Sequence, residues 1–148
     1  MTINVFSKQV KNQMKLTLPS LSVNEGLARA VVAAFCAQLD PAAPELADVK
    51  CAVSEAVTNC IVHAYGGRGG RIYITVGLYE GRRIRIRIRD SGCGIADIRT
   101  AMQPLYTTDK TGERSGMGFS VMESFMTSLR VISTVGKGTS VTMWKHLS

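Results

Sequence analysis

Hydrophobic and polar residues alternate along five short stretches of the chain, and this period of two predicts β-strands. The expected strands are about 14–18, 71–79, 83–90, 129–135 and 139–146. Pro19 ends the first stretch, which favours a place at the edge of a sheet because proline cannot donate to a central ladder. Turns at 80–81 and 136–138 contain glycine and join the other four strands into two hairpins.

Three further stretches repeat their apolar residues with the period of an α-helix. The first helix begins at a cap, Ser22 or Asn24, and ends at about Leu39, before Asp40-Pro41. Its expected apolar stripe is Leu27, Val31, Ala34, Phe35 and Leu39. The second helix runs from about 44 to 65, with a stripe formed by Leu46, Val49, Val53, Ala56, Val57, Cys60 and Ala64. The third opens at 116–118, and its apolar face is Met117, Val121, Met122, Phe125 and Leu129.

Between the second hairpin strand and the third helix, residues 95–115 show weak periodicity and many turn formers, so we expect a loop with one short helix. The order β-α-α-β-β-loop-α-β-β predicts an α+β fold. We expect a two-layer sandwich with a mixed, mostly antiparallel sheet and helices on one face. The 148 residues suit one domain, which we place at 11–148 after an N-terminal extension, 1–10, that has no clear pattern.

Composition excludes several classes of protein. Apolar residues make up 45% of the chain, but the longest apolar run, 30–37, is far too short to span a bilayer, and the first 15 residues do not resemble a signal peptide. The four cysteines form no C-x-x-C pair, which argues against a zinc site and favours small buried side chains in a reducing cytoplasm. They are Cys36, Cys51, Cys60 and Cys93. We therefore expect a cytoplasmic protein without a membrane segment.

The net charge of +7 is unevenly distributed, because five basic residues lie in one short stretch. They are Arg82, Arg83, Arg85, Arg87 and Arg89. The charge alone is compatible with a nucleic-acid surface, a solvated face of the sheet or a surface for an acidic protein partner. Since nothing but charge supports the first of these, we expect no direct contact with nucleic acid.

In strand 83–90 the isoleucines and arginines occupy opposite faces, and the isoleucines must face the helices. Asp90 shares their parity and therefore points into the layer between sheet and helices, where a carboxylate needs a hydrogen-bond donor. Gly92 and Gly94 allow another group to approach the backbone closely. The amino group of adenine meets these requirements, although an Asp-Ser-Gly turn that ends the strand is the simpler interpretation of this segment taken alone.

Glu55, Asn59 and His63 recur every four residues and form one polar ridge on the second helix. Asn59 offers a neutral oxygen to Mg²⁺, and Glu55 could accept a proton from an attacking hydroxyl. For His63 we expect a structural or partly exposed role. The stretch Arg114-Ser-Gly-Met-Gly118 opens the third helix with backbone N–H groups that suit a phosphate. Each feature alone is common, but together they indicate nucleotide-dependent phosphate transfer.

The motifs resemble those of the GHKL superfamily of ATPases and kinases. Ser54-Glu-Ala-Val-Thr-Asn59 resembles its N box, Asp90-Ser-Gly-Cys-Gly94 its first glycine box, Ser115-Gly-Met-Gly118 its second, and Gly138-Thr139 its late Gly-Thr element. Within the superfamily, 34–41, 103–108 and 113–119 are similar to the anti-sigma F factors of endospore-forming bacteria. This resemblance extends from about Lys11 to the C-terminus.

The resemblance implies a Bergerat ATP-binding fold and a homodimeric serine kinase. Such a kinase inhibits the sporulation sigma factor F and phosphorylates an anti-anti-sigma protein with Mg-ATP. By motif position Glu55 is the general base, Arg114 contacts the γ-phosphate, and Asn59 is the Mg²⁺ ligand. The implied nucleotide site adds Asp90, Gly92, Gly94, Ile95, Thr108, Ser115, Gly116, Met117, Gly118 and Thr139. Arg29, which lies off the apolar stripe of the first helix, is expected to contact both protein partners.

Two departures and two alternatives bear on this interpretation. Asp109-Lys110 stands where relatives carry Lys-Pro, which puts a lysine contact to phosphate in doubt, and His63 is followed by alanine where glycine is common. A non-catalytic nucleotide-binding switch is the main alternative, but such a module does not need a base at Glu55. The ATPase domain of a sensor histidine kinase would need an upstream helical pair with a phosphoacceptor histidine, for which we see no room in 148 residues.

Overall fold

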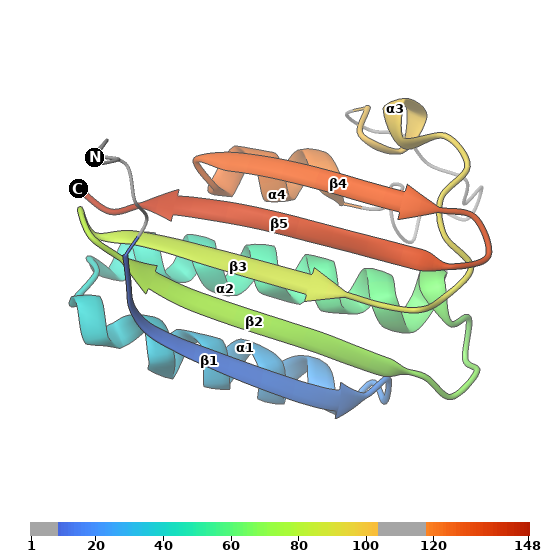
Figure 1. Ribbon diagram of the computed structural model, residues 1–148, viewed down its shortest axis with the longest axis horizontal. Coiled ribbons are helices and arrows are strands. Elements are labelled where there is room, and N and C mark those ends of the chain that lie inside the picture. Colours follow the sequence, from blue (N-terminus) through green and yellow to red (C-terminus); the bar gives the residue numbers. More distant parts are fainter. Residues whose placement is uncertain (1–8, 104–117) are drawn as a thin grey trace, which may run out of the picture.

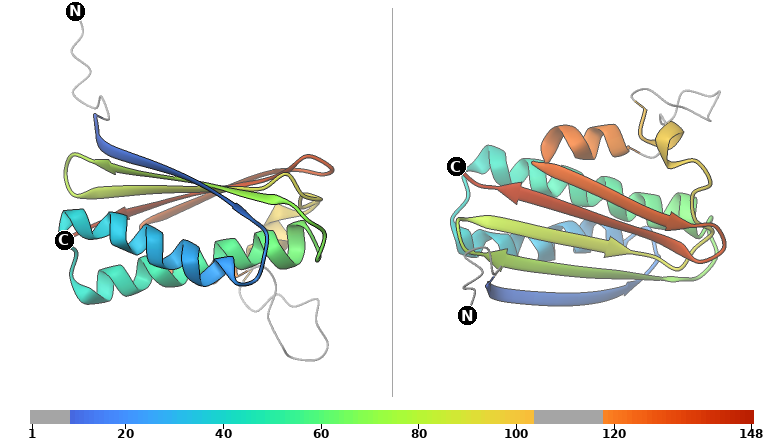
Figure 2. Two further views of the ribbon diagram at one scale, coloured as in Figure 1. Left: turned by 90° about the horizontal axis from the view of Figure 1, so that it is seen from below. Right: turned by 45° about the horizontal axis from the view of Figure 1, so that its top comes forward.

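The computed structural model describes residues 9–103 and 118–148, which form a five-stranded sheet with helices on one face (Figures 1 and 2). The strands are β1 (Val10–Pro19), β2 (Arg71–Tyr79), β3 (Arg83–Arg89), β4 (Ser128–Thr134) and β5 (Gly138–His146). Their order across the sheet is β1-β2-β3-β5-β4, so β1 is an edge strand as predicted. This arrangement confirms the predicted α+β sandwich.

All four strand pairings are antiparallel, so the sheet lacks the parallel pairing that a mixed sheet would contain. The connection between β1 and β2 explains why these two strands are antiparallel. It consists of two helices, α1 (Asn24–Cys36) and α2 (Ala43–Thr58), which run in opposite directions behind the sheet (Figure 1). An even number of helices returns the chain to the end where β1 finished, and β2 therefore runs back alongside it.

Helix α1 buries only part of the stripe that we predicted. Phe35 and Leu39 pack against the core, but Leu27 is exposed. The residues with less than a tenth of their surface accessible are instead Ala28, Val32, Ala33 and Cys36. The helix also lacks the expected side-chain cap, because Val23 precedes it and the Asn24 amide donates to the carbonyl of Pro19 at 2.9 Å. Its end is as expected: a 3₁₀ turn, η1 (Ala37–Leu39), leads to Asp40 in a left-handed conformation.

Helix α2 buries most of its predicted stripe, including Val49, Val53 and Val57, against the isoleucines of β2 and β3. After α3 (Ile98–Ala101), the short helix expected in the long loop, the chain is described again from Gly118. Helix α4 (Phe119–Phe125) buries Phe119 and Met122, but Val121 is exposed, which contradicts its predicted place on the apolar face.

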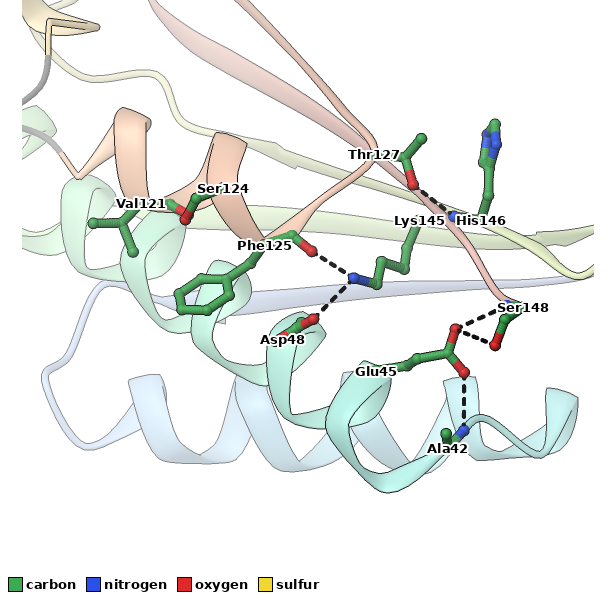
Figure 3. A network of polar contacts seen from close by, with 10 residues as sticks. All are labelled: Ala42, Glu45, Asp48, Val121, Ser124, Phe125, Thr127, Lys145, His146 and Ser148. Carbon is green, nitrogen blue, oxygen red and sulfur yellow. Dashed lines mark hydrogen bonds and ion pairs between the residues drawn. The ribbon is translucent and has the colours of Figure 1, made fainter.

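A polar network joins β5 to the helices near the C-terminus (Figure 3). The ammonium of Lys145 donates to Asp48 Oδ2 on α2 at 3.0 Å and to the carbonyl of Phe125 on α4 at 2.6 Å. Glu45, in the first turn of α2, accepts from the backbone N–H of Ser148 at 2.9 Å and from that of Ala42 at 3.1 Å. These bonds lower the pKa of the Glu45 carboxyl and fix the chain end to α2. Among the described residues, no helix has the length and apolar character needed to cross a membrane.

Candidate active site

The second helix changes its geometry where the predicted polar ridge begins. After Thr58 the chain continues as a π-helical segment, η2 (Asn59–Ala64), in which the Tyr65 N–H donates to the carbonyl of Cys60 at 3.1 Å. A π-helical turn accommodates one more residue than an α-turn and occurs frequently at functional sites. Glu55 lies before this segment and Asn59 is its first residue, so these two residues keep their α-helical spacing. His63 lies within the segment.

A pocket lies between η2, the segment after β3, the start of α4 and β5. Five residues of the predicted nucleotide site line it: Asn59, Asp90, Gly94, Ile95 and Thr139. Ala56, Cys60, His63, Ala64, Phe119 and Val141 complete the lining. The pocket thus combines apolar walls with a few polar groups, which is typical of sites for planar organic ligands.

Asp90 points into this pocket and is buried, with 6% of its surface accessible, as the alternation in β3 predicted. Its Oδ1 atom accepts from the N–H of Gly92 at 2.9 Å and from the N–H of Thr139 at 3.2 Å. Strand β3 ends at Arg89, so Asp90 itself lies just beyond the strand and at its junction with the glycine segment. The backbone therefore fixes the orientation of the carboxylate.

The glycine segment packs against the backbone of η2. The Cys93 N–H donates to the carbonyl of Ala64 at 3.0 Å. A methyl group at Gly92 would lie 2.4 Å from the carbonyl oxygen of Ala64. Because this oxygen belongs to the backbone, no side-chain rotation could relieve the clash. Gly92 thus serves the close packing of two backbones that form the pocket.

Gly118 brings the start of α4 against the proposed base. Its φ of 65° lies in the left-handed region, and a methyl group there would be 2.3 Å from Glu55 Oε2. The Glu55 carboxylate therefore lies directly beside Gly118, the last residue of the predicted second glycine box. The remaining predicted residues of that region, Thr108, Arg114, Ser115, Gly116 and Met117, lie outside the described residues.

Ser133 is a site residue that the sequence analysis missed. Its hydroxyl accepts from the Ile95 N–H at 2.8 Å and lies 2.7 Å from Thr139 Oγ1. It also lies 3.2 Å from the carbonyl of Gly138, to which it donates. One hydroxyl on β4 thereby connects Ile95, the residue after the first glycine box, to the Gly-Thr element.

Tyr65 is a second residue that the sequence analysis missed. Its hydroxyl accepts from the Ser91 N–H at 2.8 Å and donates to the carbonyl of Arg71 at 2.5 Å. The phenol thus anchors the segment after Asp90 to the start of β2. Neither Tyr65 nor Ser133 belongs to a recognisable motif, and an aromatic residue followed by two glycines was the only sequence signal.

The cysteines divide into two classes. Cys36 and Cys60 are buried as predicted, but Cys51 and Cys93 are exposed, which corrects the expectation that all four are buried. Burial raises the pKa of the Cys60 thiol, and the neighbouring Asp90 carboxylate raises it further. The raised pKa favours the protonated thiol of Cys60 in the pocket.

Arg29 lies away from the pocket, on the exposed side of α1. Its guanidinium donates to Glu25 Oε1 at 3.1 Å and to Ser54 Oγ at 3.2 Å. It therefore connects α1 to the residue that precedes Glu55 on α2. A groove beside it is lined by Glu25, Ser54, Ile61 and Val62 among others.

The site offers three chemical functions. Asp90 presents a fixed acceptor in an apolar pocket, Asn59 presents an amide, and Glu55 places a carboxylate beside the start of α4. No group of three or more His, Cys, Asp or Glu residues in the described part of the chain could hold a metal ion alone. A metal here would need further ligands such as phosphate oxygens and water, which is how Mg²⁺ commonly binds.

Sequence comparisons identify the family to which the chain belongs. Residues 18–145 match the family of histidine kinase-like ATPase domains. The chain is 55% identical over 136 residues to the anti-sigma F factor of Thermoanaerobacter sp. (strain X514), covering 92% of this chain and 94% of the relative. It is 51% identical over 140 residues to the anti-sigma F factor of Priestia megaterium, covering 94% and 95%.

Two solved structures share the fold at low sequence identity. The RsbU and RsbW domains of a Mycobacterium tuberculosis protein superpose with a TM-score of 0.68 at 19% identity, covering 92% of this chain and 32% of that one. The catalytic domain of the histidine kinase ThkA superposes with a TM-score of 0.58 at 15% identity, covering 92% and 96%. At these identities they establish the fold alone.

Proposed function

Because the chain belongs to the anti-sigma F factor family of histidine kinase-like ATPases, we propose that it inhibits sigma factor F and phosphorylates its antagonist. The antagonist is an anti-anti-sigma protein, and the phosphate passes from Mg-ATP to a serine hydroxyl. The ATPase domain binds ATP, and the protein acts as a cytoplasmic homodimer.

The observation that carries this proposal is the meeting of three motifs around one pocket. Asp90, Thr139 and Asn59 line it, and Glu55 lies beside Gly118 at the start of α4. The buried Asp90 carboxylate suits the exocyclic amino group of adenine, while the phosphates extend toward Asn59 and Gly118.

In this assignment Glu55 accepts the proton of the serine hydroxyl as its oxygen attacks the γ-phosphorus. Asn59 would hold Mg²⁺ through its amide oxygen, and the ion would neutralise charge on the phosphates. Glycine at position 118 leaves room for the Glu55 carboxylate beside the helix start. Arg114 and the residues 115–117 complete the phosphate contacts in this proposal.

We propose that the protein partners dock on the exposed side of α1. Arg29 is the cationic centre of this surface, with 44% of its side chain exposed. Val23, Leu27 and Val62 expose large apolar side chains on the same elements, α1 with its preceding turn and η2. Arginine beside exposed apolar groups is a common composition for binding hot spots.

The alternative is a nucleotide-binding switch that never transfers phosphate. The test mixes the purified protein, Mg-ATP and the anti-anti-sigma protein, and measures phosphoserine by mass spectrometry. We expect Glu55→Gln to lower the transfer rate by about 10²–10⁴ while nucleotide affinity and sigma inhibition remain. Asn59→Ala should weaken Mg-ATP binding and abolish transfer without unfolding the protein. Equal transfer by the unmodified protein and both variants would exclude this catalytic assignment.

A further inference from the structure

The hydroxyl groups of Ser133 and Thr139 form a cross-strand pair at the edge of the pocket. Ser133 on β4 lies directly opposite Thr139 on β5. Both side chains project to the side of the sheet that the helices cover, because they share the parity of the core residues Val131 and Val141. Thr139 is buried and lines the pocket together with Asp90, whereas Ser133 is half-buried and contacts Thr139 from the next strand.

Three contacts converge on the Ser133 hydroxyl and determine where its proton goes. The Ile95 N–H donates to it at 2.8 Å, the Gly138 carbonyl lies 3.2 Å away, and Thr139 Oγ1 lies 2.7 Å away. A serine hydroxyl has one proton to donate and two lone pairs that accept. The N–H occupies one lone pair, and the carbonyl, which can only accept, takes the proton. The second lone pair is left for Thr139, whose hydroxyl must then be the donor.

The opposite direction of the Ser133–Thr139 bond satisfies fewer groups. If Ser133 donated to Thr139, the Gly138 carbonyl would lose this donor, and the Thr139 proton would need another acceptor. Within the described part of the chain, Ser133 is the one hydrogen-bond partner of Thr139 Oγ1. The arrangement in which Thr139 donates to Ser133 is therefore the one that satisfies all three contacts at once.

The direction of this bond determines what Thr139 offers to a ligand. With its proton directed at Ser133, the hydroxyl presents only lone pairs to other groups. The neighbouring Asp90 carboxylate is also an acceptor, and its Oδ1 atom is already held by the Thr139 N–H at 3.2 Å. Two adjacent acceptors suit an amino group, which has two N–H donors, and they oppose a carbonyl oxygen.

We propose that Ser133 is a positioning residue for the choice of purine. By accepting the Thr139 proton, it makes the pocket favour a 6-aminopurine nucleotide over a 6-oxopurine nucleotide. This inference rests on the proposed function, since it places the base beside Asp90. The Asp90 carboxylate favours an amino group by itself. Ser133 adds to that preference because a Thr139 hydroxyl without this partner could turn and donate to a 6-oxo group.

The test is isothermal titration calorimetry with ADP and with inosine diphosphate, which differ at carbon 6 of the purine and share the sugar and the phosphates. The unmodified protein should bind ADP at least about tenfold more tightly. Ser133→Ala should reduce this ratio of affinities roughly 3- to 10-fold, because the released hydroxyl can donate to the 6-oxo group. A purely structural role would weaken both nucleotides together and leave the ratio unchanged. Ser128→Ala, at the exposed end of the same strand, is the control and should keep the ratio.

Thr139→Val provides a second readout, because it removes the hydroxyl and keeps the shape of the side chain. In this background Ser133→Ala should leave the ratio unchanged, since no hydroxyl remains to be released. An unchanged ratio in the single Ser133→Ala variant would overturn the proposal. An equally large change in the Thr139→Val background would overturn it as well.

Asp90→Asn distinguishes a failure of this inference from a failure of the nucleotide site itself. Its amide can donate to a 6-oxo group, so this variant should lower the ratio whatever Ser133 does. A lower ratio in Asp90→Asn with an unchanged ratio in Ser133→Ala would refute the role of Ser133 alone. No preference for ADP in the unmodified protein would show that the base does not lie beside Asp90, and the adenine assignment would then fail together with this inference.

Discussion

Asp90 and Thr139 are joined by two hydrogen bonds across 49 residues of sequence. The Asp90 N–H donates to the Thr139 carbonyl at 2.9 Å, and the Thr139 N–H donates to Asp90 Oδ1 at 3.2 Å. The backbone of β5 therefore determines where the carboxylate points. Oδ1 therefore holds the carboxylate in place. We assign the binding of the ligand to the other carboxylate oxygen, Oδ2.

Asp90→Asn tests that separation. The amide keeps an oxygen for the N–H groups of Gly92 and Thr139, but it places a donor where the adenine amino group needs an acceptor. We expect the affinity for ADP to fall by about 1–3 kcal/mol, roughly 5- to 150-fold, with little change in melting temperature. Isothermal titration calorimetry measures this, and Asp97→Asn, an exposed change outside the pocket, is the control. Unchanged affinity would remove Asp90 from the adenine site.

Gly118→Ala should impair both folding and transfer. A methyl group there meets Glu55 Oε2 at 2.3 Å and forces a left-handed conformation on alanine. We expect a loss of about 1–2 kcal/mol in the free energy of unfolding and a lower rate of phosphate transfer. Gly26→Ala, in the first turn of α1 where the nearest atom is 3.8 Å away, should instead stabilise the protein by about 0.4–1 kcal/mol. Urea denaturation compares the two variants, and equal effects would contradict this explanation.

Four strands were predicted to within one residue, and in β3 the alternation of isoleucine and arginine fixes both the element and its faces. Strand β1 begins at Val10, four residues before its predicted start. Helix α1 was harder because its apolar residues lie on more than one side. Small residues such as Ala28 pack against the sheet, while Leu27 remains exposed. A prediction from hydrophobicity alone places the larger side chain, Leu27, in the core instead of Ala28. The predicted stripe therefore differs from the buried one.

Lys145→Met tests the connection between β5 and the helices. With 12% of its side chain exposed, Lys145 supplies donors to both Asp48 and the Phe125 carbonyl. Methionine fills a similar volume but leaves these acceptors without that donor, so we expect a loss of about 1–3 kcal/mol in the free energy of unfolding. Lys50→Met, on the exposed side of α2, should change it by less than about 0.5 kcal/mol. Thermal denaturation of both variants shows whether the loss of stability comes from the bonds that Lys145 makes or from the removal of any positive charge.

Arg29→Ala should weaken binding of sigma factor F and of the anti-anti-sigma protein together, each by more than about 1 kcal/mol. Because Arg29 also bonds Glu25 and Ser54, the variant could act by loosening α1 from α2. Glu25→Gln disturbs the same pair while keeping the guanidinium, and it should leave both affinities near normal. Separate titrations of the two partners provide the measurement. Normal affinity for either partner after Arg29→Ala would refute a shared site.

The sequence predicted the site residues that belong to motifs and missed those that act by tertiary contact. Asn59 and Asp90 were found because their neighbours and the strand parity constrain them. Ser133 contacts Ile95 across 38 residues and Tyr65 contacts Ser91 across 26, so no local pattern marks either. The π-helical turn was also unpredictable, since four-residue spacing of polar groups predicts an ordinary helix.

The extra residue in the turn Asn59–Ala64 also constrains how the gene can vary. Each residue of an α-helix turns the chain by about 100°. Because the π-turn holds one residue more than an α-turn, deleting one residue between Cys60 and Ala64 would let the segment return to an ordinary helix with the Ala64 carbonyl still directed at Cys93. Inserting one residue would instead rotate that carbonyl away from Cys93 while Asn59 kept its place. An insertion in this segment should therefore inactivate the protein more readily than a single deletion, even where every motif residue survives.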